Sequence, residues 1–290
     1  MDRLRNILLF AALGCFALSF LLSGLYPWLI TSGHVPEAGW DEVSRVVSEE
    51  FKDLKERWPV AFAATYPGSE AALTAEQLAG LPEDDPRRAA SDAAWHAALK
   101  QALRDGRDSY VGEGCWHCHS QYVRPVSNES VRFGPVSTWQ QDDNVLQRPV
   151  MWGTRRVGPD LTYEGGLHSN DWHAAHLWDP RGTSPDSVMP RYTWMFRDGF
   201  QLRRRIAPDA AERAGLPADT SYPIAGVYDT REQADQALTR LAAALPAPLA
   251  PEKERLFVAE GRGLNGTGLS LLAYLQWLGT WRRPDVEALP

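Results

Sequence analysis

The run Cys115-Trp116-His117-Cys118-His119 constrains this chain more than any other part of its sequence. Two cysteines three positions apart, followed at once by a histidine, are typical of covalent haem attachment. Each thiol can add to one vinyl group of the macrocycle, and the next residue then places its imidazole under the iron. We therefore expect one covalent haem c, held by Cys115, Cys118 and His119, with loop-rich polypeptide around it.

Other cysteine chemistries account for the motif less well. The chain has three cysteines, and the third, Cys15, lies in an apolar run far from the other two. A zinc site would need four ligands, and the use of both His117 and His119 would be cramped. A thioredoxin-like dithiol needs a βαβ setting that the sequence lacks. A disulfide is compatible with export but leaves His119 unexplained.

The sixth iron ligand has to come from elsewhere in the chain. Met189 is the first choice, because a thioether before a proline on a stiff turn can hold a weak ligand, and methionine–histidine ligation suits electron transfer. Met151 and Met195 are the alternatives, although each would also serve as an apolar filler beside the ring. Bis-histidine ligation stays open through three downstream histidines: His168, His173 and His176. The last two are also spaced to bind a metal, for which the sequence shows no third ligand.

Further side chains are expected around the haem. The carbonyl group of Pro159 lies on a rigid turn and is suited to fix the second nitrogen of the proximal imidazole. Three arginines are candidates for the haem propionates, because a guanidinium binds carboxylates as a fork: Arg124, Arg155 and Arg156. Trp152 and Pro159 bracket two of these arginines in sequence, so we place Trp152 in the same pocket.

Residues 7–30 contain no charged side chain. At 1.5 Å per residue a helix of this length spans a bilayer core of ~30 Å. Arg3 and Arg5 precede the run, and the positive-inside rule then places the N-terminus in the cytoplasm and the rest outside. A cleaved signal peptide would have a shorter apolar stretch and a small-residue cleavage site, and a lipoprotein signal at Cys15 would not continue past it. We predict an uncleaved anchor in a bacterial inner membrane, with the haem domain on the periplasmic side.

Helical periodicity and chain breaks divide the rest of the sequence. The predicted segments are a cytoplasmic tip, anchor and linker at 1–36, a helical extension at 37–105, a cytochrome c domain at 106–281 with a helical insertion at about 201–261, and a tail at 282–290. Apolar residues at three- and four-residue spacings predict an amphipathic helix over 41–58 within the extension. The net charge of −7 argues against a nucleic-acid partner, which would require a basic face.

Gly106, Tyr110 and Gly114 are spaced four apart and lead directly into the cysteine motif. A glycine lets a second helix approach closely, and the tyrosine can pack across that helix. The expected partner is the late apolar helix that contains Tyr274 and Trp277. Such a crossing resembles the terminal helices of class I cytochromes c, so the predicted fold is mainly α: a transmembrane helix followed by a class I cytochrome c-like domain with helical insertions.

Four segments in order give a more specific resemblance. They are CHSQYVRPV at 118–126, RPVMWGTRRVGPDL at 148–161, HSNDWHAAHLWDPR through SVMPRYTW at 168–194, and LLAYLQWLGT at 271–280. This succession resembles the membrane-anchored mono-haem subunit (subunit II) of cbb3-type cytochrome c oxidases. The 37–105 spacer is longer than in that family, residues 148–151 stand where a His-Pro-aromatic-Gln run is expected, and residues 131–144 match weakly.

The resemblance implies an electron relay rather than an enzyme with catalytic residues of its own. The subunit would take electrons from another c-type cytochrome and pass them to a haem–copper catalytic subunit that reduces oxygen to water, with His119 and Met189 as axial ligands. Three other functions stay open. They are the small cytochrome subunit of a nitric oxide reductase, a haem-based redox or gas sensor with an open iron position, and a stand-alone anchored shuttle.

Overall fold

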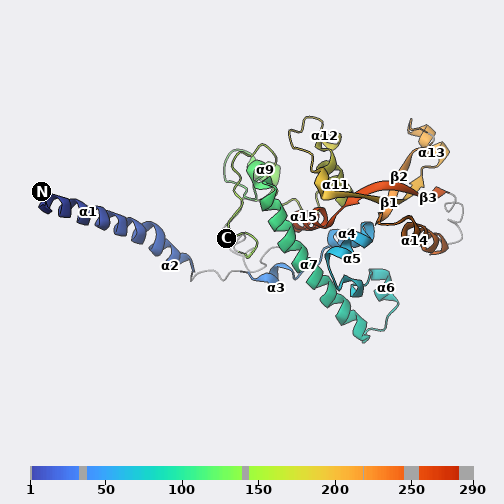
Figure 1. Ribbon diagram of the computed structural model, residues 1–290, viewed down its shortest axis with the longest axis horizontal. Helices are drawn as coiled ribbons and strands as arrows, with labels where there is room; N and C mark the ends of the chain where they lie inside the picture. Colours follow the sequence, from blue (N-terminus) through green and yellow to red (C-terminus); the bar gives the residue numbers. More distant parts are fainter. Residues whose placement is uncertain (1, 33–37, 139–143, 218, 245–254, 281–290) are drawn as a thin grey trace.

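The computed structural model describes residues 2–32, 38–138, 144–217, 219–244 and 255–280 (Figure 1). The predicted tail at 282–290 and residues 33–37 of the predicted linker lie outside the described residues. The described part is mainly helical, with a single sheet near its C-terminal end.

The N-terminal helical segment stands apart from the rest of the molecule (Figure 1). It consists of α1 (Asp2–Phe20), a π-helical turn (Leu21–Leu25) and α2 (Tyr26–Ser32). Within it, the 28 residues Arg3–Ile30 contain a stretch of 18 residues with a mean hydropathy of 2.3. No residue of that stretch is buried. An exposed apolar helix of this length suits a lipid environment, where its backbone polar groups are satisfied internally. The segment therefore fits a membrane anchor.

Two long helices, α7 (Pro86–Gly112) and α15 (Gly266–Trp277), cross at the centre of the structure. A Cβ atom on Gly106 would lie 2.0 Å from a backbone oxygen of α15, so only glycine permits this approach. The rings of Tyr110 and Tyr274 pack beside the crossing with their centroids 5.6 Å apart. The helix crossing predicted from the sequence is confirmed.

The ends of both helices follow from local sequence. The Asp85 carboxylate accepts a hydrogen bond from the backbone of Arg87 at 2.9 Å, and Pro86 occupies the first turn of α7, where no amide donor is needed. The Asn265 side chain accepts from the backbone of Gly268 at 3.1 Å and caps α15. α15 is buried from Gly268 to Trp277, and most of its side chains are apolar on every side, as expected for a buried helix.

Before α7, the segment predicted as a helical extension is built from short helices. They are α3 (Trp40–Val43), α4 (Glu49–Arg57), α5 (Pro59–Thr65), a 3-10 turn (Ser69–Ala71) and α6 (Ala75–Ala79). The prediction of one continuous helix over 41–58 is wrong. The Ser48 hydroxyl accepts a hydrogen bond from the backbone of Phe51 and so caps the start of a new helix, α4. Serine favours such a capping position over the interior of a helix. Phe51 then packs edge-on against Trp95 of α7, and α7 itself runs through the expected boundary at residue 105.

The segment predicted as a helical insertion is centred on a three-stranded antiparallel sheet. Its elements are β1 (Phe196–Arg205), α13 (Pro208–Arg213), β2 (Ser221–Tyr228), α14 (Arg231–Ala244) and β3 (Leu256–Leu264), with strand order β2-β1-β3. The prediction is right for the two helices and wrong for the strands. Leu202 of β1 and Ala234 of α14 are both buried in a small separate core, which holds α14 against the sheet.

The segment between α7 and the sheet consists of short helices joined by loops. They are α8 (Cys115–Cys118), α9 (Glu129–Phe133), α11 (Asn170–Trp178), α12 (Pro180–Thr183) and a 3-10 turn (Thr193–Met195). Backbone hydrogen bonds hold one loop alongside the cysteine motif: Gly158 donates to Cys118 at 3.0 Å, and Leu161 donates to Ser120 at 2.8 Å. These loops form the walls of the cavity described below.

Candidate haem site

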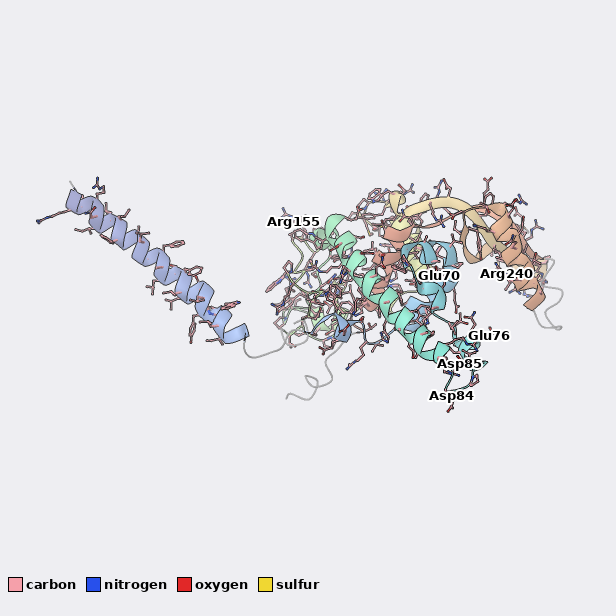
Figure 2. All side chains as sticks on the ribbon, turned by 60° about the horizontal axis from the view of Figure 1, so that its bottom comes forward. Glu70, Glu76, Asp84, Asp85, Arg155 and Arg240 are labelled. Carbon is pink, nitrogen blue, oxygen red and sulfur yellow. The ribbon has the colours of Figure 1, made fainter. Side chains whose placement is uncertain are left out.

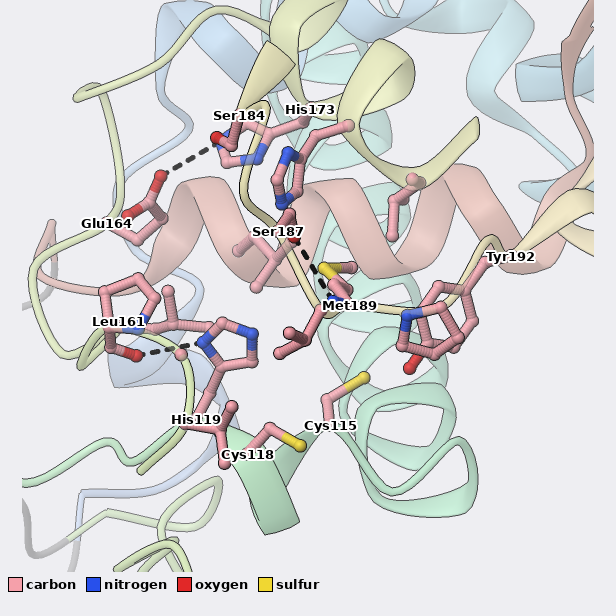
Figure 3. Close-up of a pocket in the computed structure, with 18 of the residues that line it drawn as sticks. Cys115, Cys118, His119, Leu161, Glu164, His173, Ser184, Ser187, Met189 and Tyr192 are labelled. Atoms are coloured by element: carbon pink, nitrogen blue, oxygen red, sulfur yellow. Dashed lines mark hydrogen bonds and ion pairs between the residues drawn. The ribbon is translucent and has the colours of Figure 1, made fainter. Parts of the chain in front are cut away.

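A cavity of about 500 Å³ lies between α8, α11 and the loop that precedes β1. Its lining is largely apolar, which is characteristic of sites that hold a cofactor. The residues that the sequence analysis singled out and that line it are Cys115, Cys118, His119, Pro159, His168, His173, His176 and Met189. Figure 3 shows the two cysteines at one end of the cavity and Glu164, His173 and Ser184 at the other.

The two thiols reach the cavity from a single helical turn. Gly114 has a φ of +72°, which favours glycine, and it redirects the chain from α7 into α8. Cys115 is half-buried and Cys118 is exposed. Burial raises the pKa of the Cys115 thiol to about 12.

His119 is oriented by the carbonyl group that the sequence suggested. Its Nδ1 atom donates to the Pro159 carbonyl oxygen at 2.9 Å, and Figure 3 shows the other ring nitrogen directed into the cavity. Burial lowers the pKa of His119, so the imidazole stays neutral and its free lone pair can bind a metal. A Cβ atom on Gly158 would lie 2.3 Å from the imidazole. Glycine therefore keeps room for the ring at this position.

Met189 lies across the cavity from the imidazole of His119 (Figure 3). Its backbone amide donates to the Ser187 hydroxyl at 3.2 Å, which fixes the turn that carries it. The two alternative methionines, Met151 and Met195, are buried and are absent from the described cavity lining. The geometry thus brings one thioether and one oriented imidazole to opposite sides of one cavity.

Three histidines on or next to α11 also reach the cavity, together with Glu164, which the sequence analysis missed. The Nδ1 atom of His168 lies 2.7 Å from a Glu164 carboxylate oxygen, and the Nε2 atom of His173 lies 3.5 Å from the same oxygen. His176 contacts the Thr183 hydroxyl at 2.6 Å. Burial, and then the two other histidines, lower the pKa of His173 to about 3, while burial raises the pKa of Glu164.

The arginines proposed for the propionates do not line the described cavity. Arg156 donates to the Ser120 hydroxyl at 2.6 Å and to the Asp160 carboxylate at 3.1 Å, and it pairs with Glu129. Arg124 pairs with the same Glu129 carboxylate. These partners lie 4 to 36 positions away in the chain, and the side chains of Arg124 and Arg156 pair with them rather than facing the described cavity.

The two remaining predicted residues also lie outside the described cavity lining. Arg155 is at the surface, at the opposite end of α7 from Asp85 (Figure 2), and only its backbone approaches the motif, by donating to His117 at 3.0 Å. Trp152 is 63% exposed and stacks on Tyr122 with ring centroids 4.9 Å apart. Both predicted haem contacts therefore remain without support from the geometry.

The residues present fit a covalently held haem. Two thiols at one end, an oriented imidazole with a lone pair facing inward, and a thioether opposite it surround an apolar cavity. This donor set is the one that c-type cytochromes require. It does not resemble a closed structural zinc site, which needs four protein ligands in a tetrahedron.

Comparison with known proteins agrees with this reading. No protein of curated function matches the chain. Residues 94–281, more than half of the chain, match the model of the family described as "Cytochrome C oxidase, mono-heme subunit/FixO". The match begins inside α7 and ends just beyond α15, so it covers the helix crossing, the cysteine motif and every residue of the cavity. The chain therefore belongs to the FixO family of mono-haem cytochrome c oxidase subunits, those of the cbb3-type oxidases.

Proposed function

We propose that this chain binds one haem c through thioethers to Cys115 and Cys118, with His119 and Met189 as axial ligands, and relays electrons to the haem–copper subunit of its oxidase. The observation that carries the proposal is the convergence of both thiols, the inward nitrogen of His119 and Met189 on one apolar cavity. When bound, the haem supplies an iron that can cycle between the ferrous and ferric oxidation states.

The residues of this chain would hold that iron at fixed geometry. The Pro159 carbonyl fixes the tautomer and the plane of the His119 ring, because a carbonyl oxygen can only accept a hydrogen bond. The Ser187 hydroxyl fixes the turn of Met189. The apolar lining excludes water and disfavours the more highly charged oxidised iron. Together with methionine–histidine ligation, this favours a high reduction potential.

The position of the cavity supports electron exchange with partners. Cys118 is exposed, so the haem edge next to it would lie near the surface. The anchor, with Arg3 and Arg5 at its start, supports a cytoplasmic N-terminus and a haem domain on the periplasmic side of the inner membrane. A c-type cytochrome would dock from that side as the electron donor. The haem–copper subunit, held in the same membrane, would accept the electrons and reduce oxygen to water.

Met189 provides the sharpest test of the ligand set. In the purified oxidase complex, Met189→His should lower the midpoint potential of the haem c and remove its sulfur-to-iron charge-transfer band. Met195→Leu is the matched control, because Met195 is buried away from the cavity and leucine nearly conserves its volume. An unchanged band and potential in Met189→Ala would show that another residue is the ligand.

Attachment and relay are tested separately. Cys115→Ser combined with Cys118→Ser should abolish haem staining of this subunit on a denaturing gel, and retained staining would contradict the attachment. In the native complex, electrons from a reduced c-type cytochrome should reach oxygen only when the haem of this subunit is present. Reduction of nitric oxide without reduction of oxygen would instead identify the catalytic partner as a nitric oxide reductase.

A further inference from the structure

Three side chains outside the proposed iron ligands form a compact cluster at the edge of the cavity. One ligand atom from each of Glu164, His168 and His173 lies within 4.8 Å of the other two. Glu164 lies on the loop after Leu161, and the histidines lie just before and within α11. Figure 3 shows Glu164 and His173 at the end of the cavity away from the cysteines. The sequence paired His173 with His176 and showed no third ligand, whereas the fold groups His173 with His168 and Glu164.

His173 carries a polar atom that nothing in the described structure satisfies. Its side chain is 5% exposed, and its Nε2 atom has no hydrogen-bond partner among the described residues. The closest carboxylate oxygen, on Glu164, is 3.5 Å away, which is too long for a hydrogen bond. Buried polar atoms without partners are rare, and each calls for an explanation such as a bound ion.

Glu164 adds a buried negative charge to the same place. Its side chain is 9% exposed, and the ion-pair contacts recorded for it within the described residues are to His168 and His173. A buried carboxylate needs a cation or a metal nearby. The same negative charge disfavours an anionic haem carboxylate at this spot.

The surrounding structure holds the two histidines in place before anything binds. The ring of His168 stacks on Trp172 with centroids 3.8 Å apart. The backbone carbonyl of His168 accepts a hydrogen bond from the side chain of Gln276, on the buried helix α15, at 2.9 Å. Ser169 caps α11 and so sets the direction in which His173 projects. A site on such fixed elements loses little entropy on binding.

We propose that Glu164, His168 and His173 bind a divalent transition-metal cation of the zinc type at the end of the haem cavity away from the cysteines. Two imidazole nitrogens and one carboxylate oxygen are the three protein ligands of several zinc sites that leave a fourth position open. Softer sites would use thiolates, and sites for magnesium or calcium would use oxygen ligands alone. A bound cation would add positive charge next to the haem and favour its reduced form.

The test uses the intact oxidase complex, first stripped with a chelator and then dialysed against Zn²⁺. Metal analysis should find one tightly bound Zn²⁺ that depends on this cluster. Glu164→Gln and His168→Gln should each weaken its binding by at least about tenfold, because each removes a ligand. His96→Gln is the matched control: it removes an imidazole on α7, which contacts the Ser44 carbonyl oxygen and lies outside the cluster.

The cation should also be detectable at the haem. Addition of Zn²⁺ should raise the midpoint potential of the haem c in the native complex and in His96→Gln, but not in Glu164→Gln. Equal Zn²⁺ affinity in the native complex and both cluster variants would overturn the proposal. His168 is 41% exposed, so its variant serves if Glu164→Gln does not fold. Haem staining reports on the cysteine attachment alone, so failure of the zinc site and failure of the haem site are distinguishable.

Discussion

The helix crossing and the loop cluster around Arg156 both support the cavity, but they do so by different means. At the crossing, Gly106 lets α7 touch α15, and the contact is made of backbone and apolar side chains. In the loop cluster, the Asp160 carboxylate accepts from Ser120, Tyr122, Thr162 and Arg156. One region depends on shape, and the other depends on charge and hydrogen bonds.

This difference determines which changes each region tolerates. Close-packed atoms resist any added volume but do not respond to pH. A buried carboxylate with several donors tolerates small changes of shape but not the loss of its charge. The cysteine motif connects the two regions, because α8 follows α7 directly and its next residues bond to the loop of Asp160.

The largest effect is expected at the crossing. Gly106→Ala would place a methyl group 2.0 Å from a backbone oxygen of Ser270, so the helices must separate. We expect the free energy of unfolding to fall by about 3 kcal/mol or more, measured by denaturation of the detergent-solubilised chain. Gly112→Ala, on the same helix with nothing within 4 Å, should be neutral or slightly stabilising. Equal effects of the two changes would show that the crossing is not close-packed.

A smaller effect is expected in the loop cluster. Asp160→Asn keeps the shape of a buried side chain but removes its charge and one acceptor, which leaves Arg156 and Ser120 poorly paired. The expected loss is about 2 kcal/mol, and haem incorporation should fall with it. Asp171→Asn is the control, because Asp171 is exposed and pairs only with Arg57 among the described residues. A loss no larger than that of the control would show that the buried network contributes little.

The smallest effect is a dependence on pH. Arg124, and then Arg156, hold the pKa of Glu129 at about 2, below its ordinary value of 4.5. A lowered pKa means that this contribution to stability is present above pH 4.5 and is lost as the pH falls towards 2. Between pH 4.5 and pH 2 the free energy of unfolding of the native chain should therefore fall towards that of the Glu129→Gln variant. Acid denaturation of the two chains measures this difference. A difference between the two chains that stays constant from pH 6 to pH 2 would contradict the ion pairs.

The sequence predicted the features that depend on neighbouring residues. The cysteine motif and the apolar anchor each lie in one short run, and Gly106 with Tyr110 indicated the helix contact because their spacing follows the helical period. The carbonyl of Pro159 was also found, because a rigid turn limits where its oxygen can point.

The features that depend on distant residues were missed. The pairing of β1 with β3 joins Phe196 to Leu264 across the whole insertion, and β1 is rich in arginine, which gives little sign of a strand. Arg156, which was assigned to the haem, pairs with Glu129, 27 positions away in the chain. A sequence shows that a guanidinium is present, but only the fold shows which carboxylate is nearest.

The sheet also couples two segments that lie far apart in the chain. Trp58, at the junction of α4 and α5, and Val227 of β2 are both buried in the main core, where both helices contact β2. Gly263 of β3 fits against both side chains, so the extension and the insertion cover each other. Either segment alone would expose large apolar surface to water. Removal of either segment from this chain should therefore destabilise the other.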